Sequence, residues 1–394
     1  MRKREKNNMV ASAVDTIDEQ ALVAWTQALV RHASPQTDLF EAEPQVQSII
    51  GDVVTPLLEQ LGLPSRRDKM GNLLVELGEG TTRDSLLLTP YTMTHPASAM
   101  NNPWGGEIVE RGGRKCVRGR GVAEQKACLA AAIAATAAAA RGKIRGRLVL
   151  AVSTAGETGR HDAVRSIIEE LGYVPKLGIV AIGTSGKISL GNKGRLDVTV
   201  RVHGKACHSS MPWDGINAIE GLRKVLGQVA KLKFEKGSHR MLGKATLTPT
   251  FIETAPRATH TVQASATLTL DRRLLPGQKP AMALKEIKRG LKLGRPFKLT
   301  VEPGPFMYPC EIKPTGRLVK AIEAGCAAAG LPKPGAFWSH GALDAGYLTE
   351  SGCEAAMWGP GPMELWHKDE EYVAIEDLVA GAKSYLGVIR TTVC

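Results

Sequence analysis

The pattern of apolar positions changes near residue 193. Before that point, stretches with an apolar residue at every third or fourth position alternate with short stretches that are apolar throughout. The short stretches 147–153 (RLVLAVS) and 177–182 (LGIVAI) are typical of strands buried on both faces of a parallel sheet. The Ala-rich run 124–140 is nearly apolar on every side, which predicts a helix buried inside the domain. This part of the chain therefore predicts an α/β domain with a mainly parallel sheet.

From residue 194 the pattern is different. Leu196, Val198, Val200 and Val202 alternate with polar residues, so the predicted strand has one face in water. The next segments complete the order β-α-β-β-α-β, which describes a ferredoxin-like α+β unit. Their approximate bounds are helix 216–232, strands 244–252 and 264–270, helix 281–293 and strand 297–301.

The two parts of the α/β domain are separate in the sequence. Helical patterns resume after the ferredoxin-like unit, at 318–329 and 375–388. A chain of 394 residues is too long for one comfortable domain. We therefore expect one α/β domain from residues 1–193 and 306–394, with residues 194–305 inserted into it as a smaller α+β domain.

Composition places the chain among ordinary globular proteins. It is 43% hydrophobic and 23% charged, and no run of about 20 strongly apolar residues predicts a membrane-spanning helix. The start, Met1–Asn8, is basic and no apolar segment follows it, which argues against a secretory signal. The seven cysteines are scattered without a CxxC pair, which favours neither a disulfide framework nor a thiolate zinc site. These features favour a cytoplasmic protein.

The net charge of +12 is the unusual quantity. The Lys and Arg residues are spread along the chain apart from the initial MRKREK, and aromatic residues make up 5%. This distribution argues against nucleic-acid binding and favours either attraction of small anionic substrates or no special role for the charge. We therefore expect a small-molecule substrate, and neither a nucleic acid nor a membrane as a partner.

Acid–base and metal-binding side chains lie in four segments next to predicted strands or helices. Because catalytic groups in an open parallel sheet gather beyond the carboxyl ends of its strands, we expect these segments to meet. They are 89–96 (TPYTMTHP) with Tyr91 and His95, 119–126 (GRGVAEQK) with Glu124, 153–161 (STAGETGRH) with Glu157, and 365–372 (LWHKDEEY) with His367 and, just before it, Glu364.

Simpler roles also fit some of these residues. Glu124 could be an acid favoured by the dipole at the start of a helix, and Glu157 could cap the helix that follows it. His367 stands before a charged run and could be a plain surface histidine. The order of the motifs along the chain favours a functional role over these alternatives.

That order resembles the M20 metallopeptidases, a family of carboxypeptidases, deacetylases and amidohydrolases. The chain carries Gly-Arg-Gly-x-x-acid-x-Lys, then acid-x-Gly, then Asp-x-Arg, GPG and a late His. The most specific match is Lys193–Ile219 (KGRLDVTVRVHGKACHSSMPWDGINAI). The resemblance implies that residues 1–193 and 306–394 are a catalytic, metal-binding domain. It also implies that residues 194–305 are a lid or dimerisation domain through which the protein forms a homodimer.

The resemblance implies a metal site as well, with departures from the family pattern. Members of the family usually hold two zinc ions, bridged by an acid at the position of Glu124. Glu157 and His367 match the other ligands of one ion. The positions that would serve the second ion read YTM at 91–93 and IGT at 182–184, where neither expected ligand is present.

We therefore predict one divalent metal ion per chain, held by Glu124, Glu157 and His367. Two carboxylates and an imidazole suit Zn²⁺ and, almost equally, Mn²⁺. Three protein ligands with an open position are the catalytic rather than the structural pattern. A bound ion can lower the pKa of its water to about 7, so that hydroxide forms without a strong base. This matters because Gly156 stands where the family has its general base.

Four further residues are candidates for the same site. His95 is the first candidate for a proton shuttle or a replacement ligand, because it lies four residues beyond a lost ligand position. Tyr91 could donate a hydrogen bond to a developing anion. The resemblance places an active-site loop at SHGALDAG, which contains His340 and Asp344.

Two residues of the insertion also match family residues. His208 matches a histidine that polarises the substrate carbonyl, often across a dimer. Arg273 matches an arginine near the substrate carboxylate. Preorganised donors of this kind are worth about 3 kcal/mol of transition-state stabilisation.

The function that follows is hydrolysis of a carbon–nitrogen bond in a small, carboxylate-bearing molecule by metal-activated water. The family implies amide or peptide hydrolysis. The altered site also admits hydrolytic deamination of an aromatic amine, since the resemblance includes aminohydrolases of the 5-nitroanthranilate type. The alternative is a catalytically silent relative that binds a ligand.

Overall fold

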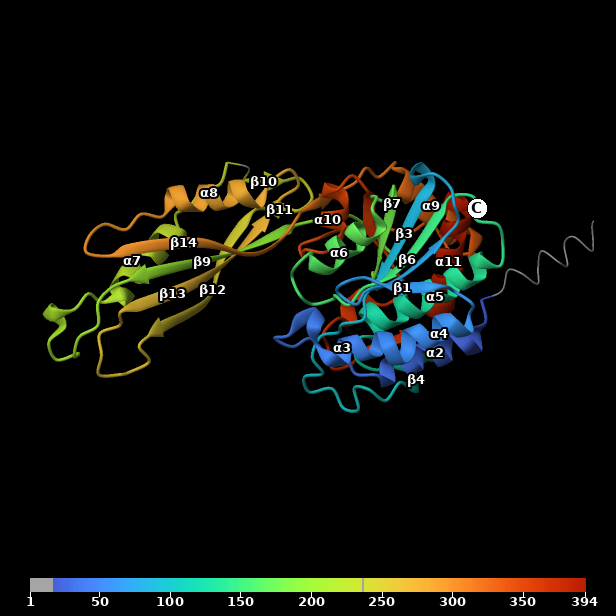
Figure 1. Cartoon of the computed structure of the whole chain (residues 1–394), viewed down its shortest axis with the longest axis horizontal. Coiled ribbons are helices and arrows are strands. Elements are labelled where there is room, and N and C mark those ends of the chain that lie inside the picture. The colour runs from blue at the N-terminus through green and yellow to red at the C-terminus, as the bar shows by residue number, and fades with distance from the viewer. Residues whose placement is uncertain (1–16, 236) are drawn as a thin grey trace, which may run out of the picture. The chain divides into compact units, whose positions relative to one another are not determined.

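The computed structural model describes residues 17–235 and 237–394 (Figure 1). The basic start Met1–Asn8 lies outside the described residues. The chain divides into two compact units, which confirms an α/β domain with an inserted α+β domain. Unit 1 contains the described residues up to Leu190, then 312–337 and 347–394; unit 2 contains 191–311 and 338–346. The division therefore differs by a few residues from the expected one, and it assigns 338–346 to unit 2 rather than to the α/β domain.

Unit 1 is built around a six-stranded sheet of order β1-β2-β6-β3-β7-β17. β6, β3, β7 and β17 are mutually parallel. At one edge, β2 runs antiparallel to β6, and β1 runs antiparallel to β2. The central strands are buried on both faces, as their continuous apolar runs predict. The strands are β1 Ser65–Arg67, β2 Leu73–Leu77, β3 Ser85–Pro90, β6 Arg147–Val152, β7 Leu177–Ala181 and β17 Glu354–Met357.

The Ala-rich helix α5 (Ala127–Ala140) is buried along nearly its whole length. It packs against β3, β6 and β7 and against the helices α2 and α11, so its small side chains allow close contact on every side. Figure 1 shows α5 beside the C-terminal helix α11. The other helices of the unit are α2 Glu19–Arg31, α3 Pro44–Ser48, α4 Thr55–Gln60, α6 Asp162–Leu171, α9 Arg317–Ala328 and α11 Ile375–Val393, and α10 spans Ala345–Glu350.

Two small three-stranded sheets were not expected from the sequence pattern. One has the order β18-β5-β4 and the other the order β15-β8-β16. In the first, Tyr372 pairs with Arg118, which places the segment after His367 beside the strand that leads into Glu124. The strands are β4 Glu107–Arg111, β5 Arg114–Arg118, β8 Ile188–Asn192, β15 Cys310–Glu311, β16 Ala336–Ser339 and β18 Tyr372–Ala374.

Unit 2 has the ferredoxin-like arrangement that the sequence predicts. Its sheet has the order β12-β13-β9-β14 with all neighbours antiparallel. The alternating apolar residues of β9, such as Val198 and Val200, pack with Leu222 and Val225 of α7 and with Ile287 of α8. The elements are β9 Gly194–His203, α7 Ala218–Val229, β12 Thr246–Ala255, β13 Ser265–Leu274, α8 Pro280–Gly290 and β14 Lys298–Met307, with a short hairpin of β10 Ser238–His239 and β11 Gly243–Lys244.

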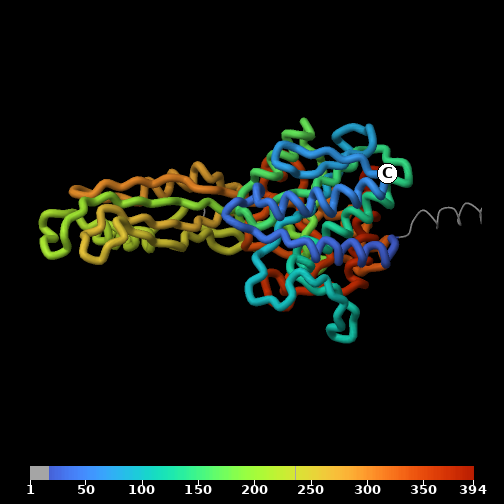
Figure 2. Tube along the Cα trace, turned by 60° about the horizontal axis from the view of Figure 1, so that its bottom comes forward, coloured from blue at the N-terminus to red at the C-terminus, as the bar shows by residue number. Residues whose placement is uncertain are grey.

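The chain enters and leaves unit 2 on paired strands (Figure 2). Asn192 of β8 pairs with Cys310 of β15, and Gly191 pairs with Glu311. An insertion whose two ends are adjacent in this way can fold on its own without interrupting the parent sheet. Among the described residues, no helix is long and apolar enough to cross a membrane.

Candidate metal centre

Glu124 lies in a short π-helical turn, Val122–Lys126, just before α5. The turn follows Gly121, which has the left-handed conformation with φ +78°. A Cβ at Gly121 would also come within 2.3 Å of the Thr94 methyl carbon, so only glycine fits here without a shift. The turn directs Glu124 into the interior, where the residue is only 8% exposed.

Glu157 lies in the loop that follows β6, at the carboxyl end of that parallel strand. Its Oε1 accepts a hydrogen bond of 3.1 Å from Nε2 of Gln125, which is the residue next to Glu124. This contact ties the β6 loop to the turn that carries Glu124. The carboxylates of Glu124 and Glu157 therefore reach the same place from different segments of the chain.

His367 completes the group from the C-terminal part of the chain. Its Nε2 lies 3.2 Å from Glu124 Oε2 and 3.2 Å from Glu157 Oε1. The residue has φ +60°, a left-handed conformation that is uncommon for a residue other than glycine. Such backbone strain often accompanies functional sites, where the surrounding structure holds a side chain in place.

Glu124 and His367 each change the pKa of the other, and Glu157 acts on both. Burial, together with the neighbouring charge of Glu157, raises the pKa of the Glu124 carboxyl to about 8, although His367 acts in the opposite direction. Hydrogen bonds to Glu124 and Glu157 raise the pKa of His367 to about 10. A protonated His367 is thus the natural partner of two carboxylates. A divalent cation bound to the same three donor atoms would replace its proton.

The spacing of the donor atoms fits a metal ion. One ligand atom from each of Glu124, Glu157 and His367 lies within 4.8 Å of the other two, and this is the one such group among the described residues. Two ligands that each lie about 2.1 Å from a tetrahedral ion are about 3.4 Å apart. The distances of 3.2 Å from His367 Nε2 are close to that value. The residues present therefore fit Zn²⁺ or Mn²⁺.

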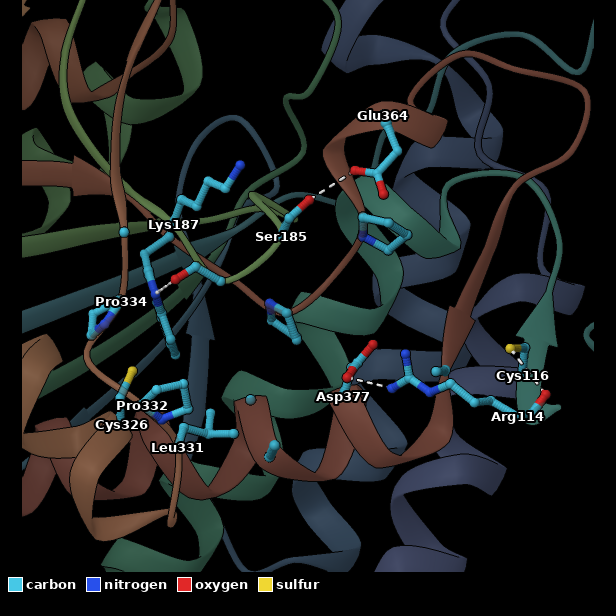
Figure 3. A pocket seen from close by; sticks show the side chains of 18 of the residues that line it. Arg114, Cys116, Ser185, Lys187, Cys326, Leu331, Pro332, Pro334, Glu364 and Asp377 are labelled. Atoms are coloured by element: carbon cyan, nitrogen blue, oxygen red, sulfur yellow. Dashed lines mark hydrogen bonds and ion pairs between the residues drawn. The ribbon is translucent and has the colours of Figure 1, made fainter. Parts of the chain in front are cut away.

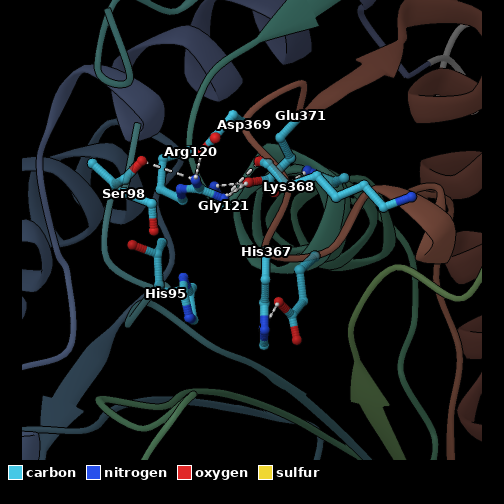
Figure 4. Close-up of polar contacts among 12 residues, drawn as sticks. His95, Ser98, Arg120, Gly121, His367, Lys368, Asp369 and Glu371 are labelled. Atoms are coloured by element: carbon cyan, nitrogen blue, oxygen red, sulfur yellow. Dashed lines mark hydrogen bonds and ion pairs between the residues drawn. The ribbon is translucent and has the colours of Figure 1, made fainter. Parts of the chain in front are cut away.

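His95 lies beside this centre, as Figure 4 shows. Its ring stacks on that of His367, with 4.3 Å between ring centroids and 15° between planes. His95 Nδ1 lies 3.1 Å from the carbonyl oxygen of Pro96, so this nitrogen carries the proton that the carbonyl accepts. Tyr91 lies at the end of β3, is 3% exposed and pairs with Ser153 through an isolated bridge.

Arg120 and Glu371 belong to the site region but were not among the expected residues. Both are almost fully buried, and Arg120 Nη1 lies 3.1 Å from Glu371 Oε2. Burial raises the pKa of the Glu371 carboxyl, while the Gly121 amide and Arg120 act in the opposite direction. Arg120 lies in the same motif as Glu124, and Glu371 lies in the same motif as His367. Their pairing spans 251 residues and so leaves no signal in the local sequence.

Backbone carbonyl oxygens lie close to two of the altered positions. One is the position of the family's general base, and the other lies in the segment 182–184, which would serve a second ion. A Cβ at Gly156, the position of the family's general base, would come within 2.3 Å of the Met93 carbonyl oxygen. A Cβ at Gly183 would come within 1.9 Å of the Ala123 carbonyl oxygen. At both positions a side chain requires the backbone to shift.

The remaining candidates lie in unit 2. His208 is exposed and its Nδ1 lies 2.7 Å from the Ser210 hydroxyl. Arg273 makes two hydrogen bonds with the Asp271 carboxylate, of 2.8 and 3.0 Å. Its Nη1 also donates to the carbonyl oxygen of His340 at 3.5 Å. The His340 side chain is exposed.

Asp344 of unit 2 is buried, with 2% of its surface exposed. Glu364 of unit 1 accepts a hydrogen bond of 2.9 Å from the Ser185 hydroxyl. Glu364 lines a cavity of about 630 Å³ in unit 1, drawn in Figure 3. None of the three metal-ligand candidates lines this cavity, so this cavity and the metal centre are different places.

Comparison with known proteins shows what this chain is similar to. Residues 190–293 match the M20 peptidase dimerisation domain. Over 384 residues, the chain is 26% identical to a succinyl-diaminopimelate desuccinylase of Methylobacterium nodulans, covering 90% of this chain and 92% of that protein. It is 34% identical to the uncharacterised protein YgeY of Escherichia coli over 122 residues, 31% of this chain and 30% of YgeY.

The fold agrees with these matches. An M20 family metallo-carboxypeptidase from Sulfolobus solfataricus superimposes with a TM-score of 0.75 at 16% identity, covering 94% of this chain and 98% of that one. The chain thus contains an M20 peptidase dimerisation domain and is similar to M20-type hydrolases of amide bonds, which agrees with the resemblance seen in the motifs. The narrower likeness to 5-nitroanthranilate aminohydrolases stays a prediction.

Proposed function

We propose that this protein is a metal-dependent hydrolase that cleaves a carbon–nitrogen bond in a small, carboxylate-bearing molecule. The observation that carries the proposal is the convergence of Glu124, Glu157 and His367, three segments far apart in the sequence, on one point with metal-ligand spacing. A salt bridge between two residues would be enough for a structural role. The third donor at the same point therefore favours a metal site. The curated relatives named as a desuccinylase and as acetylornithine deacetylases support hydrolysis of an amide.

The proposal specifies one ion per chain, Zn²⁺ or Mn²⁺. Its support is the contrast between the complete ligand set and the positions 91–93, 156 and 182–184, which offer no matching carboxylate or imidazole. When bound, the ion would supply a Lewis acid and an acidified water molecule. Glu124, Glu157 and His367 would hold it, and the stacked ring of His95 would restrict the orientation of His367.

His95 is the residue that we assign to proton transfer. Because its Nδ1 proton is engaged by the Pro96 carbonyl, the neutral ring presents Nε2 as the unprotonated, accepting nitrogen. That atom could take a proton from the attacking water and return it to the leaving nitrogen. Tyr91 remains our candidate for a hydrogen bond to the developing anion.

Substrate recognition is assigned to unit 2. We propose that the protein forms a homodimer through its dimerisation domain, and that His208 polarises the substrate carbonyl. Arg273 would bind the substrate carboxylate, which must then compete with the two hydrogen bonds from Asp271. In the loop 339–346, His340 would be a second candidate for proton transfer, after His95, and Asp344 would contribute to substrate binding. None of the seven cysteines, which all lie among the described residues, forms a disulfide, and this fits a cytoplasmic location.

A substrate screen tests the reaction class. The purified protein, loaded with Zn²⁺ or Mn²⁺, would be incubated with N-acyl amino acids, dipeptides and aromatic amines including 5-nitroanthranilate. We expect carboxylate release from an acylated substrate. Release of ammonia from the aromatic amine alone would favour the deaminase instead. Ligand binding without turnover of any substrate, in protein that holds no metal, would favour the catalytically silent relative.

A further inference from the structure

We infer that Arg120 and Glu371 are positioning residues that hold the metal ligands in place: their buried ion pair joins the segments that carry His95, Glu124 and His367. This inference rests on the proposed function, because it concerns the same metal centre. Neither side chain reaches the ligand atoms themselves. They act on the backbone from which three of the four central side chains project.

Glu371 holds the turn that presents Glu124. Its Oε2 accepts a hydrogen bond of 2.8 Å from the Gly121 amide, and its Oε1 accepts one of 2.9 Å from the Ala123 amide. These amides flank the start of the turn and have no partner within the helix that follows. A single carboxylate, 1% exposed, therefore replaces the missing helical acceptors next to a ligand residue.

Arg120 holds the other two segments. Its Nη1 donates to the carbonyl oxygen of Lys368 at 2.9 Å, one residue after His367. Its Nη2 donates to the carbonyl oxygen of Ala97 at 3.0 Å, two residues after His95. Figure 4 shows Arg120 between the loop segments that bear Ser98 and Lys368. His95 and His367 both lie on one side of Arg120.

The ion pair connects these two sets of contacts. Arg120 Nη1 also donates to Glu371 Oε2 at 3.1 Å, and both side chains are excluded from water. A buried charge keeps its place only while its partner is present, because the unpaired group would lose solvation without compensation. The left-handed backbone of His367, which is otherwise disfavoured, lies within the segment that this network restrains. Glu157 is held differently, by Gln125, and lies outside the network.

The inference predicts that metal affinity depends on residues that do not touch the metal. Removing partners that orient metal ligands typically lowers affinity 10- to 100-fold. We expect Glu371→Gln, which preserves shape but loses the charge and one acceptor, to weaken Zn²⁺ binding by about 10-fold. We expect Arg120→Met to weaken it by up to about 100-fold.

Loss of stability must be separated from loss of positioning. Arg120→Met leaves Glu371 buried and unpaired, so that variant is expected to unfold at a lower temperature. The double variant Arg120→Met with Glu371→Gln removes both charges and should recover much of that stability. Arg118→Met is the matched control, since Arg118 also binds a glutamate, Glu107, and a carbonyl oxygen, that of Asn101, but neither partner is next to a site residue.

The experiment measures three quantities on each full-length variant: unfolding temperature without metal, Zn²⁺ affinity by competition with a chromophoric chelator, and the absorption spectrum of the Co²⁺-loaded protein. We expect the double variant to regain stability while its affinity stays at least 10-fold below wild type, with an altered Co²⁺ spectrum. The Arg118→Met control should match wild type in affinity and spectrum. Glu371→Gln provides the same test should the double variant not fold.

Several results would overturn the inference. Wild-type affinity and spectrum in any folded Arg120 or Glu371 variant would reduce the pair to a structural role and leave the proposed function intact. An equal loss of affinity in Arg118→Met would show that the effect is not specific to the pair. Failure of the wild-type protein to bind Zn²⁺, Mn²⁺ or Co²⁺ would instead refute the proposed function, and the inference with it.

Discussion

Two sides of the candidate centre offer opposite surroundings for a metal ion. On one side, Glu124, Glu157 and His367 bring their ligand atoms within 4.8 Å of one another. On the other, Gly156 and Gly183 lie against carbonyl oxygens, at distances that a Cβ would violate. Gly156, at the general-base position, and Gly183, within the segment 182–184, are thus both held against backbone, so a larger side chain at either position requires the backbone to shift. The comparison predicts that a single substitution at either glycine will not restore the missing group.

The largest expected effect comes from breaking the complete side. His367→Ala removes one ligand and leaves the buried carboxylate of Glu124 and the half-buried carboxylate of Glu157 without their shared partner. We expect metal affinity to fall by more than about 100-fold, beyond the loss typical of residues that only orient ligands. Chelator competition measures this loss. His203→Ala is a control in unit 2, where His203 Nε2 lies 2.9 Å from the Thr300 hydroxyl, and equal affinities in the two variants would contradict the assignment.

Proton competition should change affinity over a similar range. The pKa of His367 is raised to about 10, so His367 must lose a proton before it binds a metal. The pKa of Glu124 is raised to about 8, so any protonated Glu124 must lose its proton as well. Metal affinity should therefore rise with pH between 6 and 8, by up to about tenfold per pH unit for each proton released. Chelator competition at several pH values tests this, and an affinity that falls as pH rises would contradict it.

The side that contains Gly156 can be tested through stability. Gly156→Ala places a Cβ against the Met93 carbonyl oxygen, and such overpacking typically costs about 1–3 kcal/mol. Gly227 lies in α7 with no atom within 4 Å of its Cβ position, so Gly227→Ala should be neutral or stabilising by about 0.5–1 kcal/mol. Denaturant unfolding compares the two. A Gly156→Ala protein as stable as wild type would mean that the backbone does not crowd this position.

The smallest effect is expected at His95, which contributes to the complete side by stacking alone. An aromatic pair is worth about 0.5–1.5 kcal/mol. We therefore expect His95→Ala to weaken metal binding by no more than about tenfold, and His95→Phe to restore most of the loss. A loss in His95→Ala as large as that in His367→Ala would show instead that His95 is itself a ligand.

The sequence predicted the parts of the structure whose signals are local. The continuous apolar strands, the buried Ala-rich helix and the alternation in β9 each reflect a period in the residues themselves. The three ligand candidates each lie next to a predicted strand or helix, but their assignment as one ligand set came from the resemblance to the M20 metallopeptidases. Their grouping in space then agrees with the topology of a parallel sheet.

What could not be predicted depends on contacts between distant segments. β5 (RKCVR) is short, carries three charged residues and shows no strand period, yet it pairs with both β4 and β18. The Arg120–Glu371 pair arises from that pairing, because β18 places its preceding residues beside the GRG motif. The left-handed backbone of His367 likewise has no sign in the residue type.

The central claim is a single ion held by two carboxylates and one imidazole. The most direct test is a crystal structure of the protein grown with Zn²⁺ or Mn²⁺, with the metal located by anomalous scattering. The account predicts one anomalous peak per chain at the site, within about 2.0–2.2 Å of Glu124, Glu157 and His367. Two peaks at the site, or a peak that is not bound by these three side chains, would contradict it.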